Sequence, residues 1–148
     1  MQKKQAFIGR KVADKNIQLL LQVVAKMNDI ESKKEDCPHR IKNVVIFGSY
    51  LSDKRIIGDI DLFIELESKW QDKKAEMDFF YHHREGIRSY FERMTTSDYL
   101  TMKMLRCKKK SFSFHDMYEM ADLIQVNPSL NYKYIVKNFK ILQNENDK

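Results

Sequence analysis

Two short apolar runs constrain the fold more than any other feature of this sequence. The first covers residues 44–47, is rich in β-branched residues and stops at Gly48, and the second covers residues 60–66. The first run is unbroken and ends at a turn residue, which is typical of a strand buried on both faces. The second run is interrupted by Asp61 and Glu65 and is also predicted to be a strand. We therefore predict that the two runs are neighbouring strands in the interior of a sheet.

Apolar residues recur at helical spacing in four other parts of the chain. The pattern predicts helices over residues 5–28, 70–94 and 117–125. After a break at an Asn-Pro-Ser sequence, residues 130–142 are expected to form a last amphipathic helix. The helices would pack their apolar stripes against the sheet.

Two further segments alternate between apolar and polar residues, as half-buried strands do. Residues 99–106 and 110–115 are predicted to form a hairpin around three lysines, and residues 31–40 are predicted to form a polar loop. The expected order of elements is α-β-β-α-β-β-α-α. This order indicates an α+β domain in which helices cover one face of a small mixed sheet.

Composition narrows the class of protein. The chain has 148 residues, enough for one domain with a substantial core, and no apolar run that approaches the roughly 18 residues needed to span a bilayer. No apolar segment follows the charged N-terminus, so a secretory signal is not expected. Cys37 and Cys107 are far apart and form no CxxC pair, which argues against a disulfide framework or a zinc site. We expect a cytoplasmic protein with no membrane association.

The net charge of +6 favours an anionic partner, and a nucleoside triphosphate, a nucleic acid or an acidic protein would each fit. The lysines and arginines are spread along the chain and do not form one run. A solvated basic surface produces the same pattern. Binding of nucleic acid without nucleotide chemistry is therefore a hypothesis that rests on net charge alone.

The residues that carry chemical information lie next to the two predicted strands. Asp59 and Asp61 are two positions apart, so on a strand their carboxylates emerge from one face, with Cα atoms about 7 Å apart. Like charges at that spacing repel. A Mg²⁺ ion bound by the carboxylate oxygens, which are the hard ligands that it prefers, would relieve the repulsion. Gly48 and Ser49 follow the first strand, where glycine permits close approach of a phosphate and serine can hydrogen-bond its oxygens. Aspartates that simply face water on a half-exposed strand are the alternative.

This combination resembles the signature of the DNA polymerase β-like nucleotidyltransferase superfamily: a strand, Gly-Ser, a spacer, and Asp-x-Asp on the next strand. The resemblance covers residues 44–66. It implies that Asp59 and Asp61 hold Mg²⁺ and that Gly48 and Ser49 bind the triphosphate. The resemblance implies that residues 1–125 form a nucleotidyltransferase domain. We expect residues 126–142 to form a C-terminal helix packed on the same domain, and residues 143–148 to form a disordered tail.

Members of the superfamily usually have a third carboxylate on a neighbouring strand. By resemblance, Asp116 is the candidate catalytic residue here. On a strand whose Phe112 and Phe114 face the helices, however, Asp116 would face the helices as well, away from Asp59 and Asp61. Asp116 is also well placed to cap the following helix. His115 would be on the opposite, open face of the strand and is the alternative metal ligand or phosphate contact. Glu65 shares the parity of Asp61 but lies further along its strand.

The resemblance implies an enzyme that transfers a nucleoside monophosphate from an NTP to an acceptor hydroxyl. The chain looks like a minimal prokaryotic nucleotidyltransferase, a subgroup in which a partner protein, often a HEPN-domain ribonuclease toxin, is the acceptor or complex mate. The alternative is a catalytically degenerate module of the same fold that binds a partner protein, nucleotide or RNA. The missing third acid on the correct face of the strand favours the degenerate module, and the intact Gly-Ser and Asp-x-Asp pairs favour the enzyme.

Overall fold

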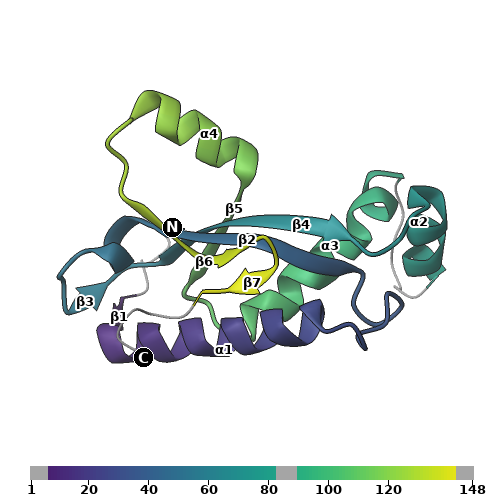
Figure 1. The fold of residues 1–148 in the computed structure, drawn as a ribbon, viewed down its shortest axis with the longest axis horizontal. Coiled ribbons are helices and arrows are strands. Elements are labelled where there is room, and N and C mark those ends of the chain that lie inside the picture. Colours follow the sequence, from purple (N-terminus) through teal and green to yellow (C-terminus); the bar gives the residue numbers. More distant parts are fainter. Residues whose placement is uncertain (1–6, 83–89, 143–148) are drawn as a thin grey trace, which may run out of the picture.

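The computed structural model describes residues 7–82 and 90–142 and shows a mixed α+β fold (Figure 1). The strands are β1 (Ile8–Gly9), β2 (His39–Phe47), β3 (Ile56–Ile57), β4 (Ile60–Ser68), β5 (Phe112–Asp116), β6 (Tyr132–Lys137) and β7 (Lys140–Ile141). The helices are α1 (Arg10–Asn28), α2 (Lys73–His82), α3 (Tyr90–Arg106) and α4 (Met117–Val126), with a 3₁₀ turn, η1 (Gly48–Leu51). Among the described residues, no helix combines the length and apolar character that crossing a bilayer requires.

The two apolar runs are neighbouring interior strands, as predicted. The main sheet has the order β5-β4-β2-β6-β7, and β1 pairs with β3 in a separate two-stranded ribbon. β4 is parallel to β5, and the other neighbouring pairs are antiparallel, so the main sheet is mixed. The central register places Phe47, the last residue of β2, opposite Asp61 near the start of β4.

The larger core lies between the sheet and α1. The helix buries residues at three- and four-residue steps, namely Ala13, Asn16, Ile17, Leu20, Val24 and Met27. Alternate residues of the strands, including Val44 and Ile46 of β2 and Leu62 and Ile64 of β4, join the same cluster, together with Leu105 of α3. Alternation along each strand sends the intervening residues to the opposite face.

That opposite face carries a smaller cluster, which corrects the expectation that helices cover one face only. Val45, Phe47 and Phe63 form this cluster with Met120 of α4. The rings of Phe47 and Phe63 stack with their centroids 4.0 Å apart. The rest of α4 extends away from the sheet (Figure 1). Helices therefore lie on both faces, with α4 covering only part of the second one.

The predicted hairpin over residues 99–106 and 110–115 is wrong in its first half and in its pairing. Residues 99–106 belong to α3, and residues 112–116 form β5, which runs parallel to β4. In the part of α3 whose burial is described, residues 96–106, the buried side chains are Thr96, Ser97, Thr101 and Leu105. The last three follow a four-residue repeat that the alternation between polar and apolar residues obscured. Residues four positions apart lie on one side of a helix, so Ser97, Thr101 and Leu105 can all be buried together.

The predicted C-terminal helix over residues 126–142 is also wrong. Beyond the end of α4, the segment forms the hairpin of β6 and β7, and β6 pairs with the free side of β2. Asn138 and Phe139 connect the two strands, with φ angles of 49° and 71°. Two consecutive left-handed residues are the geometry of a type I′ hairpin turn, and asparagine at the first position favours it. The β-branched and aromatic composition of β6 agrees with strand structure.

Other boundaries differ by a few residues. α1 begins at Arg10 because Ile8 and Gly9 pair with β3. The predicted loop over residues 31–40 ends early, since β2 already begins at His39. The predicted helix over residues 70–94 is represented by α2 and the start of α3, and its middle lies outside the described residues, as does the tail at 143–148. The helix predicted over 117–125 is confirmed as α4.

A buried polar network joins α2 and α3 to the start of β2. The His39 imidazole is buried and lies 3.0 Å from Asp98 Oδ1 through Nε2, and 2.6 Å from the Thr101 hydroxyl through Nδ1. The fully buried Glu76 carboxylate accepts hydrogen bonds from the hydroxyls of Ser68 and Ser97, at 2.6 and 2.7 Å. Buried polar groups cost free energy unless they are paired, and these are paired.

The hydrogen bond from His39 lowers the pKa of the Asp98 carboxyl below its usual value, against the smaller opposing effect of burial. A lowered pKa in the folded state gives stability that is present above the unfolded-state pKa of about 3.9 and lost as pH falls through the folded-state value. We expect Asp98→Asn to lower the urea midpoint at pH 7, and this difference to shrink below about pH 4. The exposed Asp53→Asn is the control, and an equal loss at both pH values would contradict the assignment.

Candidate functional site

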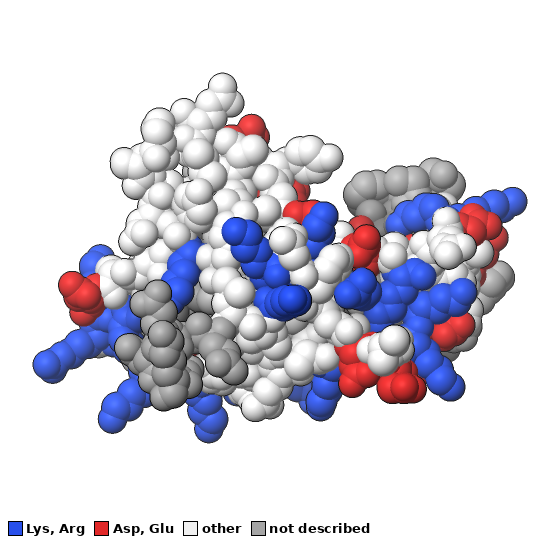
Figure 2. Space-filling model, in the orientation of Figure 1, with Lys and Arg blue, Asp and Glu red and all other residues white. Residues whose placement is uncertain are grey.

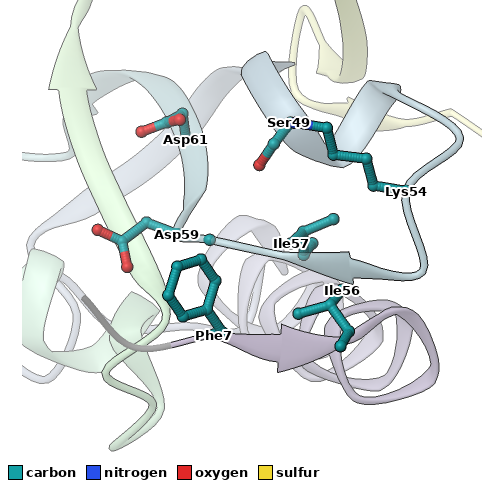
Figure 3. A pocket seen from close by; sticks show the side chains of 8 residues that line it. Phe7, Ser49, Lys54, Ile56, Ile57, Asp59 and Asp61 are labelled. Carbon is teal, nitrogen blue, oxygen red and sulfur yellow. The ribbon is translucent and has the colours of Figure 1, made fainter. Parts of the chain in front are cut away.

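The predicted site residues meet at the ends of the two central strands. Gly48 and Ser49 begin η1 directly after β2, Asp61 is the second residue of β4, and Asp59 precedes β4 by one residue. Ser49, Asp59 and Asp61 line one cavity of about 450 Å³, which also includes Lys54. In Figure 3 the two carboxylates lie on one side of this pocket, and Ser49 and Lys54 lie on the other.

Gly48 is required by its conformation and by its neighbour. Its φ of +79° lies in the left-handed region, which side chains disfavour, and a Cβ built on it would lie 2.8 Å from Asp61 Oδ2. The backbone of β2 therefore turns into η1 in direct contact with the Asp61 carboxylate. The glycine of the Gly-Ser pair is thereby explained by geometry, independently of any ligand.

The surroundings of Asp61 disfavour the ionised form of its carboxyl group. Burial raises the pKa of its carboxyl, and the neighbouring Asp59 charge raises it further, while the His115 imidazole opposes both. Nε2 of His115 lies 3.5 Å from Asp61 Oδ1, and its Nδ1 lies 2.7 Å from Glu119 Oε2. A cation bound beside Asp61 would favour the ionised carboxylate, because opposite charge offsets the loss of hydration.

His115 reaches Asp61 because β5 runs parallel to β4 in a fixed register. Asp61 lies opposite Ser113, and Phe63 lies opposite His115. The buried Phe112 faces the α1 core, so Ser113 and His115 face the other side, where Asp61 lies. This parity agrees with the sequence-based expectation.

Asp116 is not brought into the pocket. It is paired with Ile64, three positions along β4 from Asp61, and has the opposite parity from His115. Its carboxylate accepts the backbone N–H of Glu119 at 2.8 Å and so caps α4. The predicted catalytic role of Asp116 is therefore corrected to helix capping.

Glu65 also lies outside the site, where it accepts a hydrogen bond from the Asn43 amide and pairs with Lys42.

Arg10 makes contacts next to the pocket that the sequence analysis did not predict. Its guanidinium donates to three backbone carbonyls of the loop after β2: Tyr50 at 2.8 Å, Ser52 at 2.6 Å and Lys54 at 3.0 Å. It thereby holds the segment that carries Ser49 and Lys54. No local pattern around residue 10 signals this contact, because its partners are 40 or more positions away.

Charge is not gathered into one patch on the face shown in Figure 2. Lysines and arginines occur across the body of the molecule with acidic residues among them, and the region of α4 is largely uncharged. Several of the basic side chains are paired, as Arg40 is with Glu67 and Lys42 with Glu65. This distribution agrees with a solvated basic surface on this face.

We expect Gly48→Ala to destabilise the protein by about 1–2 kcal/mol, because alanine disfavours the left-handed conformation. The required displacement of Asp61 adds to this cost. Gly9→Ala is the matched control: Gly9 has a φ of −70° and open space at its Cβ position. There the free energy of unfolding should change by no more than about 0.5 kcal/mol. Urea unfolding measures both, and equal effects would contradict this account of Gly48.

Capping by Asp116 predicts different results for two substitutions. Asp116→Asn should leave the free energy of unfolding nearly unchanged, whereas Asp116→Ala should lower it by about 1 kcal/mol, since asparagine caps a helix about as well as aspartate and alanine does not. Thermal and urea unfolding give the comparison. A large loss in the asparagine variant would show that the charge of Asp116 has a role other than capping.

The chain was compared with family models, curated proteins and solved structures, and none of them matches it.

Proposed function

We propose that this chain has a polymerase β-like nucleotidyltransferase fold, binds an NTP together with Mg²⁺ and transfers the nucleoside monophosphate to an acceptor hydroxyl. One observation carries the proposal: Ser49, Lys54, Asp59 and Asp61 line a single pocket at the ends of two paired central strands. A cation, a hydroxyl and a pair of carboxylates around one cavity provide complementary contacts for a metal-bound polyphosphate.

The donor set suits Mg²⁺. This ion commonly uses one or two protein carboxylates and completes its coordination with water and substrate phosphates. Asp59 and Asp61 would hold it, and the ion would supply the positive charge that a triphosphate beside two carboxylates requires. The pKa of Asp61, raised by burial and by Asp59, supports this role because such a carboxylate gains from a nearby cation.

The remaining groups would bind and orient the triphosphate. The Lys54 ammonium would pair with phosphate oxygens, the Ser49 hydroxyl would donate to one of them, and Arg10 would keep the loop of both residues in place. In the transfer, the acceptor oxygen forms a bond to the α-phosphorus and the bond to pyrophosphate breaks. The acceptor proton passes to solvent. A partner protein such as a HEPN-type toxin is the acceptor that the sequence resemblance suggests.

A second candidate function has a specific observation in its favour. Asp116 caps α4, and over residues 7–82 and 90–142 no three or more His, Cys, Asp or Glu side chains are grouped so that they could hold a metal ion. Two-metal transfer sites normally use more carboxylates than the two found in this pocket. A module of the same fold that binds a nucleotide without transferring it would need only Asp59, Asp61, Ser49 and Lys54.

Calorimetric titration with ATP, GTP, CTP and UTP, with and without Mg²⁺, tests the proposal. At least one NTP should bind, and Mg²⁺ should strengthen binding by about tenfold or more, equivalent to 1.4 kcal/mol. Asp59→Asn and Asp61→Asn should each abolish this Mg²⁺ effect. Glu65→Gln is the control, because Glu65 is a carboxylate of β4 that pairs outside the pocket.

Transfer of a label from [α-³²P]NTP to a co-purified or added acceptor then separates the two candidate functions. Label on an acceptor, lost in Asp61→Asn, supports the enzyme. Mg²⁺-dependent binding without label on any acceptor supports the binding module. If no NTP binds in the presence of Mg²⁺, both are rejected.

A further inference from the structure

One side of the pocket is apolar, and the phosphate and metal contacts do not use it. Phe7 and Ile56 line the same cavity as Ser49, Asp59 and Asp61, and their side chains are 65% and 64% exposed. Among the side chains that the structure describes, Ile30, Tyr118 and Val126 are the large apolar ones that are more exposed to water. Figure 3 shows both around the pocket that holds the two aspartates.

Ile56 belongs to the β1–β3 ribbon, and Phe7 directly precedes β1. Ile8 pairs with Ile57 and Gly9 pairs with Ile56. Ile57 is buried in the core beside α1, and Ile8 packs against the same cluster. Because side chains alternate along a strand, Phe7 and Ile56 are directed away from that core. Gly58 follows β3 and also lines the pocket.

The pocket thus has two chemically different parts. Lys54, Ser49 and the aspartates form a charged part suited to phosphates and a cation, and Phe7 with Ile56 forms an apolar part. Its volume of about 450 Å³ exceeds what a polyphosphate chain needs and lies in the usual range for small-molecule sites. A ligand that fills both parts carries an anionic group at one end and a flat apolar group at the other.

We propose that Phe7 and Ile56 form the platform on which the base of the bound nucleotide stacks. This inference rests on the proposed function in one respect, that the anionic ligand is a nucleoside triphosphate. Every base has a π-face, so stacking on Phe7 tolerates all of them. The site therefore distinguishes nucleotides from simple polyphosphates more strongly than it distinguishes one base from another.

The test compares ATP with inorganic tripolyphosphate, both with Mg²⁺, by calorimetric titration. Phe7→Ala should weaken ATP binding about tenfold or more and leave tripolyphosphate binding unchanged, since only ATP has a base to stack. Phe7→Trp should keep ATP affinity within about threefold of the wild type, because indole also stacks. In that variant, ATP should also change the fluorescence of the new indole. Tyr118→Ala is the control, since Tyr118 is 85% exposed and lies on α4 away from this pocket.

The outcomes separate this inference from the proposed function. If Phe7→Ala leaves ATP affinity unchanged, or weakens ATP and tripolyphosphate equally, the base platform is rejected while nucleotide binding stands. If the wild type binds none of ATP, GTP, CTP, UTP and tripolyphosphate in the presence of Mg²⁺, the proposed function fails and the platform fails with it. An unchanged melting temperature in Phe7→Ala, expected for an exposed side chain, shows that any loss of affinity is local.

Discussion

The antiparallel pairing of β2 with β4 is the constraint on which the rest of the structure depends. Both strands lie in the interior of the sheet, and apolar side chains on their two faces enter two different clusters. A shift of one residue would exchange the two faces of a strand, which burial on both sides strongly opposes. The observed register places Phe47 opposite Asp61, and Gly48 follows in contact with the Asp61 carboxylate.

The same register creates a conflict at Asp61. The side chain is on the face of the sheet that carries the stacked rings of Phe47 and Phe63, where burial disfavours its charge. The His115 imidazole, carried by β5, compensates only in part. A carboxylate held in this way gains more from a cation than an exposed one does, and conflicts of this kind occur where proteins carry out function. The conflict at Asp61 is one of the observations that support the proposed cation site at this end of the sheet.

The pocket is assembled from segments that are distant along the chain. Phe7 before β1, the loop after β2, strand β3 and the start of β4 all contribute side chains. Arg10 at the start of α1 binds the carbonyls of the loop after β2. A cation at a helix N-terminus gains nothing from the helix dipole, so its value at this position comes from the three carbonyls. The arrangement couples the position of α1 to the geometry of Ser49 and Lys54.

The sequence by itself determined the two interior strands, α1, α4 and the meeting of Gly48, Ser49, Asp59 and Asp61, because these depend on local periodicity and on residues close together in the chain. It did not determine β6, which is a strand because β2 offers it a free edge, or the helix that includes residues 99–106, whose period becomes evident only from what it buries. Tertiary structure also decided which of His115 and Asp116 lies beside Asp61. Parallel pairing with β4 brings His115 to Asp61, and the start of α4 takes the Asp116 carboxylate as its cap. Strand pairing across long separations sets which side chains meet, and no local pattern in the sequence encodes it.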